Sequence, residues 1–301
     1  MKSIAAVFLS ILIVRAAGDQ SSSWFPLQSN LLPNSSTCGG DAAQPKILSG
    51  VETVPSELPW MVMLEYCSPG GDSLNINCSG SLINHQYVLT AAHCLTGQKL
   101  GQNGSLVSVR LGDHDTRTRI DCTRRVCAPD AVQMGIDEIK IHEEYVDGTP
   151  NFLNDIGLIR LARKVPYTAF IRPVCLPSAV GLKGWQSGQQ FTAAGWVRTC
   201  DGARSPTKLK VGANYVEIAE CRRRYASVKI DVGNSHLCAG GRQRVGSCDG
   251  DTGGPLMAYR QGVWVLAGIV SFGHGCDMIN WPAVYTDVFY HQSWITSHMR
   301  P

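Results

Sequence analysis

Residues 247–255 read Ser-Cys-Asp-Gly-Asp-Thr-Gly-Gly-Pro, and the strand-like run Val263–Phe272 follows them. The glycines predict a tight turn, because glycine adopts backbone conformations that other residues disfavour. Glycine also lets backbone N–H groups approach a bound group closely. The stretch therefore presents one hydroxyl side chain, that of Thr252, in a sharp turn.

The rest of the chain from residue 47 onward alternates in the same way between short strand-like runs and turn residues. Many short strands at close spacing predict an all-β barrel or sandwich. The runs are Trp60–Tyr66, Tyr87–Thr90, Val107–Leu111, Ile156–Leu161, Phe191–Trp196, Lys210–Ile218, Val263–Phe272 and Val284–Val288. Only the end of the chain, Asp287 to Met299, has a helical pattern of apolar residues. The basic runs Arg124-Arg125 and Arg222–Arg224 indicate solvated loop charges.

Composition excludes several classes of protein. The 301 residues are 44% hydrophobic and 17% charged, which excludes disorder as the main state. A net charge of +3 with no long basic run gives no reason to expect nucleic acid as a partner. The 12 cysteines are an even number, and so many favour an oxidising compartment.

The N-terminus has the layout of a secretory signal peptide over residues 1–18. Lys2 precedes the apolar run Ile4–Val14, and small residues follow at 16–18. The apolar run is too short to span a bilayer, which needs about 20 residues. We therefore expect a secreted, extracellular protein without a membrane partner. A buried first helix is the alternative interpretation.

Residues 19–46 are polar and rich in turn residues, which predicts a short surface pro-segment. In a secreted protein, the sequons at Asn34 and Asn103 are expected glycosylation sites. The sequon at Asn77 is weaker, because Cys78 beside it is expected in a disulfide.

Three segments carry residues suited to chemistry. Leu89-Thr-Ala-Ala-His-Cys94 holds a histidine among small residues, and Asn154-Asp-Ile-Gly-Leu-Ile159 places an aspartate at the head of an apolar strand. With the turn at 247–255 they supply a base, a carboxylate that orients it and a hydroxyl nucleophile, the parts of acyl-transfer catalysis. Each segment alone also fits a plainer role: a buried histidine, a strand cap or a tight loop.

On these residues the chain resembles the chymotrypsin-like (S1) serine proteases, especially the clip-domain group of arthropod haemolymph, over about residues 38–299. The matching segments are Lys46-Ile-Leu-Ser-Gly50, Leu58-Pro-Trp60, LTAAHC, VRLGDHD, NDIGLIRL, RPVCLP, TAAGW, LCAG, CDGDTGGPL, IVSFGHGC and PAVYTDV. The resemblance implies two six-stranded antiparallel β-barrels with the active site between them, and a C-terminal α-helix. A protease domain would occupy residues 47–301. We expect no clip domain, because the pro-segment is short and holds one cysteine.

The resemblance also implies roles for single residues. His93 would be the general base, Asp155 its orienting carboxylate and Thr252 the residue at the nucleophile position. The N–H groups of Gly250 and Thr252 would form the oxyanion hole. The specificity pocket would be formed by Gly246, Ser271, Gly273 and Ala283.

Activation would follow the family pattern. A trypsin-like protease would cut the zymogen between Lys46 and Ile47, and the new Ile47 amine would pair with Asp251. A buried ion pair is costly unless both partners are present, so this pair can act as a switch.

The family implies disulfides Cys38–Cys175, Cys78–Cys94, Cys122–Cys127, Cys221–Cys238 and Cys248–Cys276, and Cys67 and Cys200 remain as a pair. A zinc site is the alternative use of the cysteines, but their spacing lacks two close ligand pairs. We expect no cofactor or metal. Asp113 and Asp115 offer only a weak calcium site.

The sequence departs from the family at the substrate side. Thr252 stands where the family has serine, and its β-methyl restricts χ1. A mid-chain threonine also lacks the N-terminal amine that working threonine nucleophiles use as a base. At the pocket floor, Gly246 replaces the aspartate of trypsin-like members. Ala283 narrows the pocket, and Phe272 replaces a tryptophan.

Two hypotheses follow for function. In the first, the protein is a serine protease homologue of weak or no activity that binds a protein substrate or partner protease, or acts as a cofactor, in an extracellular cascade. In the second, it is an active endopeptidase that uses Thr252 and has non-tryptic specificity. A secreted structural module is a third class. It is less favoured, because the Lys46–Ile47 junction for activation is present.

Overall fold

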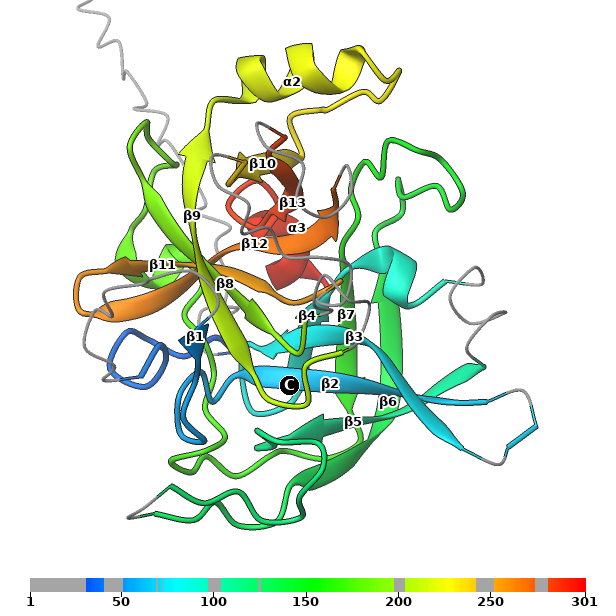
Figure 1. Cartoon of the computed structure of the whole chain (residues 1–301), viewed down its shortest axis with the longest axis vertical. Coiled ribbons are helices and arrows are strands. Elements are labelled where there is room, and N and C mark those ends of the chain that lie inside the picture. The colour runs from blue at the N-terminus through cyan, green and yellow to red at the C-terminus, as the bar shows by residue number, and fades with distance from the viewer. Residues whose placement is uncertain are drawn as a thin grey trace, which may run out of the picture.

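The fold consists of two antiparallel β-barrels, seen one above the other in Figure 1. The computed structural model describes residues 31–40, 51–68, 70–71, 73–96, 104–123, 126–197, 204–241, 252–273 and 281–301. The predicted all-β, trypsin-like class with two six-stranded barrels and a C-terminal helix is confirmed.

The first barrel closes in the order β2-β3-β4-β7-β6-β5. Its strands are β2 Met61–Cys67, β3 Leu74–Leu82, β4 Tyr87–Thr90, β5 Ser105–Leu111, β6 Val132–Ile141 and β7 Gly157–Leu161. β4 is buried along its whole length, which fixes the segment that follows it. That segment is the 3₁₀ helix η2, Ala92–Cys94, which carries His93.

The second barrel contains β8 Gln190–Gly195, β9 Leu209–Val216, β10 His236–Ala239, β11 Pro255–Arg260, β12 Val263–Phe272 and β13 Ala283–Asp287. The pairing of β8 with β9 closes it, and the short strand β1, Val51–Glu52, adds to β9. The 3₁₀ helix η3, Pro177–Val180, lies between the barrels in sequence.

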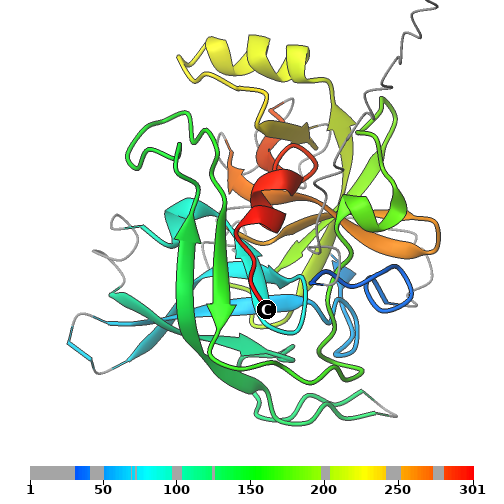
Figure 2. The same cartoon turned by 180° about the vertical axis from the view of Figure 1, so that it is seen from behind.

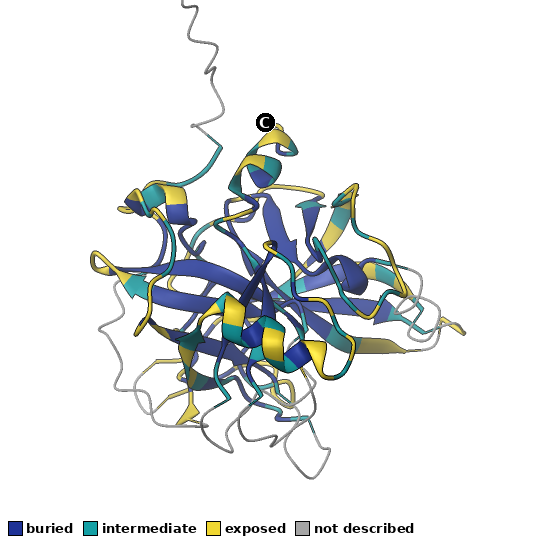
Figure 3. Cartoon of the chain, turned by 90° about the horizontal axis from the view of Figure 1, so that it is seen from above, coloured by how far each residue is buried: buried dark blue, intermediate teal, exposed yellow. Residues whose placement is uncertain are grey.

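One apolar core joins the two barrels. Buried residues of the first barrel form a single cluster with Met257, Trp264 and Leu266 of the second. Trp60 Nε1 lies 3.0 Å from Met257 Sδ across the junction. Figure 3 shows that burial is concentrated in the strands, while exposed residues lie mainly in loops and helices. The barrels therefore hold the loops between them in fixed relative positions.

The prediction that only the C-terminus is helical was wrong. Helix α2, Ile218–Ala226, buries Cys221 and Tyr225, which lie one turn apart on the same face. The run Arg222–Arg224 lies on this helix and not in a loop. Figure 1 shows α2 at the outer end of the second barrel.

The C-terminal helix α3 is shorter than predicted and covers Gln292–Ser297. The Asp287 carboxylate accepts hydrogen bonds from the N–H groups of Phe289 (2.8 Å) and Tyr290 (3.3 Å), so a turn precedes the helix. After α3 the chain runs along the back of the first barrel (Figure 2), where Arg300 N donates to Tyr87 Oη at 2.9 Å.

The predicted pro-segment is not wholly at the surface. Cys38 is buried, and Gly39 exchanges backbone hydrogen bonds with Pro173 (2.9 Å) and Trp264 (3.2 Å). Among the described residues, no helix is both long and apolar enough to cross a membrane.

Candidate active site

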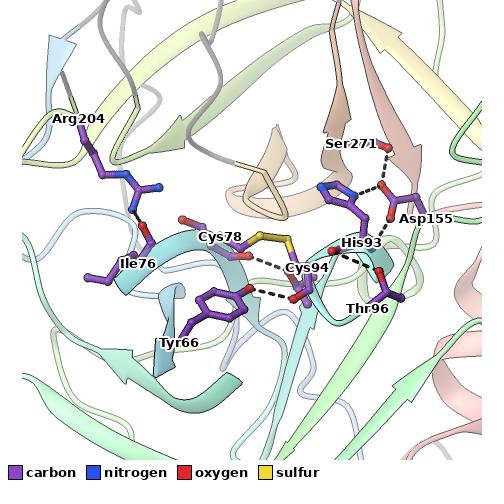
Figure 4. Close-up of a disulfide and its surroundings, with 11 residues drawn as sticks. Tyr66, Ile76, Cys78, His93, Cys94, Thr96, Asp155, Arg204 and Ser271 are labelled. Atoms are coloured by element: carbon purple, nitrogen blue, oxygen red, sulfur yellow. Dashed lines mark hydrogen bonds and ion pairs between the residues drawn. A yellow bond between two sulfur atoms is a disulfide. The ribbon is translucent and has the colours of Figure 1, made fainter. Parts of the chain in front are cut away.

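His93 and Asp155 form a buried pair between the barrels. His93 Nδ1 lies 2.7 Å from Asp155 Oδ2, and the backbone N–H of His93 donates to Oδ1 at 3.0 Å. The hydroxyl of Ser271, on β12, donates to Oδ2 at 2.5 Å. Figure 4 shows these three side chains converging from both barrels. The structure thus brings together the base and the carboxylate that the sequence analysis selected.

The Asp155 carboxylate stays ionised although it is fully buried. Burial by itself raises the pKa of a carboxyl group, but the His93 ring and the donors from His93 and Ser271 lower the pKa of Asp155 below its usual value. The ionised carboxylate accepts a hydrogen bond from His93 Nδ1–H at Oδ2, and in the neutral imidazole Nε2 then carries no proton. That tautomer is the one in which histidine acts as a general base.

A disulfide beside His93 fixes the backbone that carries it. Cys94 is bonded to Cys78 of β3, and its carbonyl accepts a 2.9 Å hydrogen bond from Tyr66 Oη. Figure 4 shows both contacts on the side of η2 that faces β3. The imidazole is therefore attached to a rigid segment.

The turn that carries Thr252 is clamped between the barrels. Thr252 O accepts a 2.9 Å hydrogen bond from Ser79 N, and Gly253 N donates to Val270 O at 2.8 Å. Gly253 has φ +81°, and a Cβ there would lie 2.2 Å from Thr90 Oγ1, so only glycine fits. Thr252 is half-buried, and within the described ranges no hydrogen bond joins its hydroxyl to His93.

An aromatic wall stands beside His93. The Phe152 ring meets the His93 ring edge-on, with centroids 5.4 Å apart, and stacks on Phe272 at 5.3 Å. Phe272 was noted from the sequence as a replacement for tryptophan. Phe152 was missed, because a single phenylalanine before Asp155 gives no signal in the sequence.

Comparisons with known proteins agree with this geometry. The sequence profile of the family described as Trypsin matches residues 47–295. This chain belongs to the trypsin family.

Several relatives of this trypsin-family chain are known as arthropod proteases. Phenoloxidase-activating factor 1 of Holotrichia diomphalia is 43% identical over 275 residues, covering 90% of this chain and 74% of that protein. Spaetzle-processing enzyme of Drosophila melanogaster is 38% identical over 285 residues, covering 91% and 71%. Among solved structures, the Drosophila Grass clip serine protease of the Toll pathway matches with a TM-score of 0.72 and 33% identity, covering 86% and 73%.

The structure places only part of the predicted specificity pocket of this trypsin-family chain. The Ser271 hydroxyl is directed to Asp155, so this side chain supports the carboxylate. Ala283 begins β13 opposite Ala239 and is half-buried. A Cβ on Gly273 would meet nothing within 4 Å, so the space beside it is open. Gly246 lies outside the described residues.

The oxyanion and activation predictions also involve residues outside the described ranges. These residues are Lys46, Ile47, Gly250 and Asp251. Of the predicted glycosylation sites, Asn103 lies outside as well. Asn34 is exposed, and its Oδ1 accepts a 2.6 Å hydrogen bond from the Ser36 hydroxyl of the same sequon.

Four disulfides in the structure have the pairing that the family implies. They are Cys38–Cys175, Cys78–Cys94, Cys122–Cys127 and Cys221–Cys238. Cys67 has no disulfide partner among the described residues. Its expected partner Cys200, and the pair Cys248 and Cys276, lie outside them.

Asp113 and Asp115, where the sequence offers only a weak calcium site, each contact an arginine side chain. Asp115 is held by Arg117, with a 2.7 Å contact between Oδ2 and Nη2, and Asp113 faces Arg110 at 3.4 Å. Within the described ranges, no three acidic, histidine or cysteine side chains are grouped as metal ligands.

Proposed function

We propose that this trypsin-family protein is a secreted protease homologue with impaired catalysis, which binds a protein substrate or partner protease in an extracellular cascade. It would be made with a signal peptide (1–18) and a pro-segment (19–46), and a trypsin-like protease would activate it at Lys46–Ile47. The observation that carries the proposal is the clamped turn at Thr252.

The backbone that carries Thr252 has little room to move. Backbone hydrogen bonds from Ser79 and to Val270 hold both sides of the turn, and Gly253 packs against Thr90 without space for one more carbon. The backbone therefore cannot shift easily to reposition the hydroxyl. A displacement of about 1 Å at a reacting group costs on the order of 10²-fold in rate.

The pocket residues support a poor fit for basic substrates. Gly246 provides no carboxylate to pair with a substrate arginine or lysine, and burying an unpaired cation is unfavourable. The methyl group of Ala283 narrows the same pocket. Small or medium apolar side chains suit this pocket better.

A role in a cascade is supported by the relatives. Two of them are named for steps on other proteins, as a phenoloxidase-activating factor and a Spaetzle-processing enzyme. Similarity over 90% or more of this chain makes an extracellular protein partner the natural proposal here.

One observation favours the second candidate function, an active endopeptidase with non-tryptic specificity. The His93–Asp155–Ser271 arrangement is complete, with contacts of 2.7 and 2.5 Å at the same carboxylate oxygen. A base of this kind is ready to activate a hydroxyl group, and a looser nucleophile contact before substrate binds does not exclude catalysis.

The deciding experiment replaces Thr252 by serine in protein cleaved after Lys46. We expect Thr252→Ser to hydrolyse its best small ester or peptide substrate at least about tenfold faster, which corresponds to roughly 1.4 kcal/mol of barrier. Thr252→Ala is the matched control, because it keeps the turn and removes the hydroxyl, and it sets the background rate. A peptide library identifies the substrate.

The two candidate functions predict different rates. If wild-type protein is as fast as Thr252→Ser and well above Thr252→Ala, it is a working endopeptidase. If both Thr252→Ser and wild type stay at background, the pocket changes are the main defect and the binding-partner role is strengthened.

A further inference from the structure

The turn before Asp155 is strained and is held by the second barrel. Phe152 and Asn154 have positive φ angles of 47° and 55°, which are unfavourable for residues other than glycine. Such conformations cost on the order of 1 kcal/mol each and persist only when the surroundings impose them. Here two residues of the second barrel hold the turn: Ser235 contacts Asn154, and His236 contacts Phe152.

His236 makes the contact to Phe152 from the start of β10. Its side chain is buried, and Nε2 lies 3.0 Å from the carbonyl oxygen of Phe152. A carbonyl oxygen can only accept a hydrogen bond, so Nε2 carries a proton and is the donor. The backbone N–H of Gly233 donates to Nδ1 at 3.1 Å. His236 is therefore a neutral imidazole in a single tautomer.

Close packing against the second barrel holds the turn at residues 152–154 in place. A Cβ on Gly233 would lie 2.6 Å from Leu153 Cδ2, which shows how closely the turn approaches the second barrel. Phe152 stacks on Phe272, and Phe272 meets Tyr225 edge-on with centroids 5.5 Å apart. The Tyr225 hydroxyl in turn donates a 2.7 Å hydrogen bond to Pro282 O.

We propose that His236 is a positioning residue of this site. Through the Phe152 carbonyl it holds the Phe152 ring between His93 and Phe272, and so sets the apolar wall that a bound polypeptide meets beside His93. The inference rests on the proposed function only in taking a polypeptide as the ligand.

Protonation of His236 would break its contact with Gly233 and leave its contact with Phe152 in place. A proton on Nδ1 would face the Gly233 N–H, so two donors would oppose each other. Burial lowers the pKa of His236, which keeps it neutral. The charged and titratable groups around His236 are Asp155, Asp231, His291 and Arg222. The two aspartates favour the protonated ring, whereas burial and Arg222 disfavour it.

Two amide variants separate the two hydrogen bonds of the His236 ring, and both remove its edge-on contact with the Phe272 ring. In His236→Gln the terminal amide nitrogen can replace Nε2 and still donate to Phe152 O. In His236→Asn the amide oxygen can replace Nδ1 and still accept from Gly233 N. If His236 positions Phe152, the glutamine variant resembles wild type and the asparagine variant does not.

The first measurement is the NMR signal of the His93 ring in histidine-labelled protein, which does not depend on activity. The Phe152 ring shifts this signal, and Phe152→Leu gives the value without that ring. We expect His236→Asn to move the signal toward that value and His236→Gln to leave it near wild type. Thermal unfolding confirms that each variant is folded.

The second measurement is kinetic, in the Thr252→Ser background. We expect His236→Asn to raise KM for peptides by about threefold or more, with little change in kcat, because the wall contacts the ligand and not the reacting atoms.

The result that overturns the proposal is a reversed order, in which His236→Asn keeps the wild-type His93 signal and His236→Gln loses it. His236 would then serve only the local turn at Gly233. If neither variant folds, Phe152→Leu decides: a His93 signal that this variant leaves unchanged also refutes the proposal. Failure of the proposed function is distinct, since it is read from the Thr252 variants.

Discussion

At the scale of single residues, the state of Asp155 depends on the donors around it. The carboxylate is fully buried, and a charge in that position is stable only when hydrogen bonds replace lost hydration. Ser271 provides one of these bonds from the opposite barrel, at 2.5 Å. Its hydroxyl therefore matters for both stability and the state of His93.

We predict that Ser271→Ala destabilises the protein by about 1–3 kcal/mol at pH 7, because a buried charged acceptor loses a donor. The pKa of Asp155 is lowered in the folded state, so the stability from its ionisation is present above the pKa of unfolded Asp and is lost as pH falls through the folded value. The variant raises the folded pKa, so its deficit should shrink in acid.

Urea unfolding at several pH values measures this effect. Ser205→Ala is the matched control, because Ser205 is buried and its hydroxyl donates to the neutral Thr207 O at 2.8 Å. Its deficit should not depend on pH in this way. Equal pH profiles for the two variants would contradict the assigned role of Ser271.

At the scale of elements, sequence patterns predicted most of the described strands and missed β1, β3, β6, β10 and β11. Tyr87–Thr90 and Val263–Phe272 have the predicted bounds, since their residues are almost all buried. β3 was missed because it contains asparagine, serine and glycine, and β6 because half of its residues are exposed. Hydrogen bonding to neighbouring strands, which a local pattern does not encode, makes these segments strands.

The candidate site divides in the same way. His93 and Asp155 could be selected because each lies in a short motif next to a strand. Phe152, His236 and the bond from Ser271 to Asp155 could not, because they depend on contacts between the barrels. The helix α2 was missed because only Cys221 and Tyr225 of its residues are buried, which leaves a weak apolar pattern.

Asp287, at the end of β13, gives a test of one element boundary. Burial raises its pKa to about 6, while its carboxylate caps the turn before α3. A raised folded pKa means that stability is full below the pKa of unfolded Asp and is lost as pH rises to about 6. We predict that Asp287→Asn, which keeps the accepting oxygen, is more stable than wild type by about 1–2 kcal/mol at pH 7.5.

Thermal unfolding between pH 4 and pH 7.5, in ~0.5 steps, measures the gain, which should vanish near pH 4. Asp130→Asn is the control, because Asp130 is exposed and forms a surface ion pair with Arg119. Such pairs contribute little, so its effect should be small at every pH. A loss of stability in Asp287→Asn at neutral pH would show that the charge itself supports the turn.

At the scale of the whole molecule, Lys208 connects the two barrels. Its N–H donates to His114 O (3.2 Å), and its carbonyl accepts from Thr53 N (2.9 Å). The side chain is buried, with Nζ 3.2 Å from Glu57 O and 5.7 Å from the centre of the Trp196 ring. A buried lysine whose close contacts are mainly neutral groups stabilises the protein less when its amine is charged than when the amine is neutral.

Burial lowers the pKa of Lys208 to about 8. The unfolded chain then binds more protons than the folded protein between this value and about 10.4, so Lys208 makes stability rise with pH in that window. We predict that Lys208→Met lacks this rise, which can reach about 1.4 kcal/mol per pH unit. Urea unfolding from pH 7 to pH 10 compares it with Lys140→Met, the control at an exposed ion pair.

The disulfide Cys38–Cys175 makes a prediction about the activated molecule. If the chain is cut after Lys46, the upstream segment keeps its bond to Cys175 and its backbone hydrogen bonds to Pro173 and Trp264. We expect gels without reductant to show one species, and gels with reductant to release the small fragment.

The double variant Cys38→Ser/Cys175→Ser is the matched control. The remaining contacts are the backbone hydrogen bonds to Pro173 and Trp264, the Asn84–Leu31 hydrogen bond and the packing of Leu31 and Leu32. They are too few to offset the entropy of holding a free fragment, so this variant should lose it on gel filtration after cleavage. Loss of the fragment from wild type without reductant would show that the disulfide does not tether the pro-segment, and retention by the double variant would show that packing alone does.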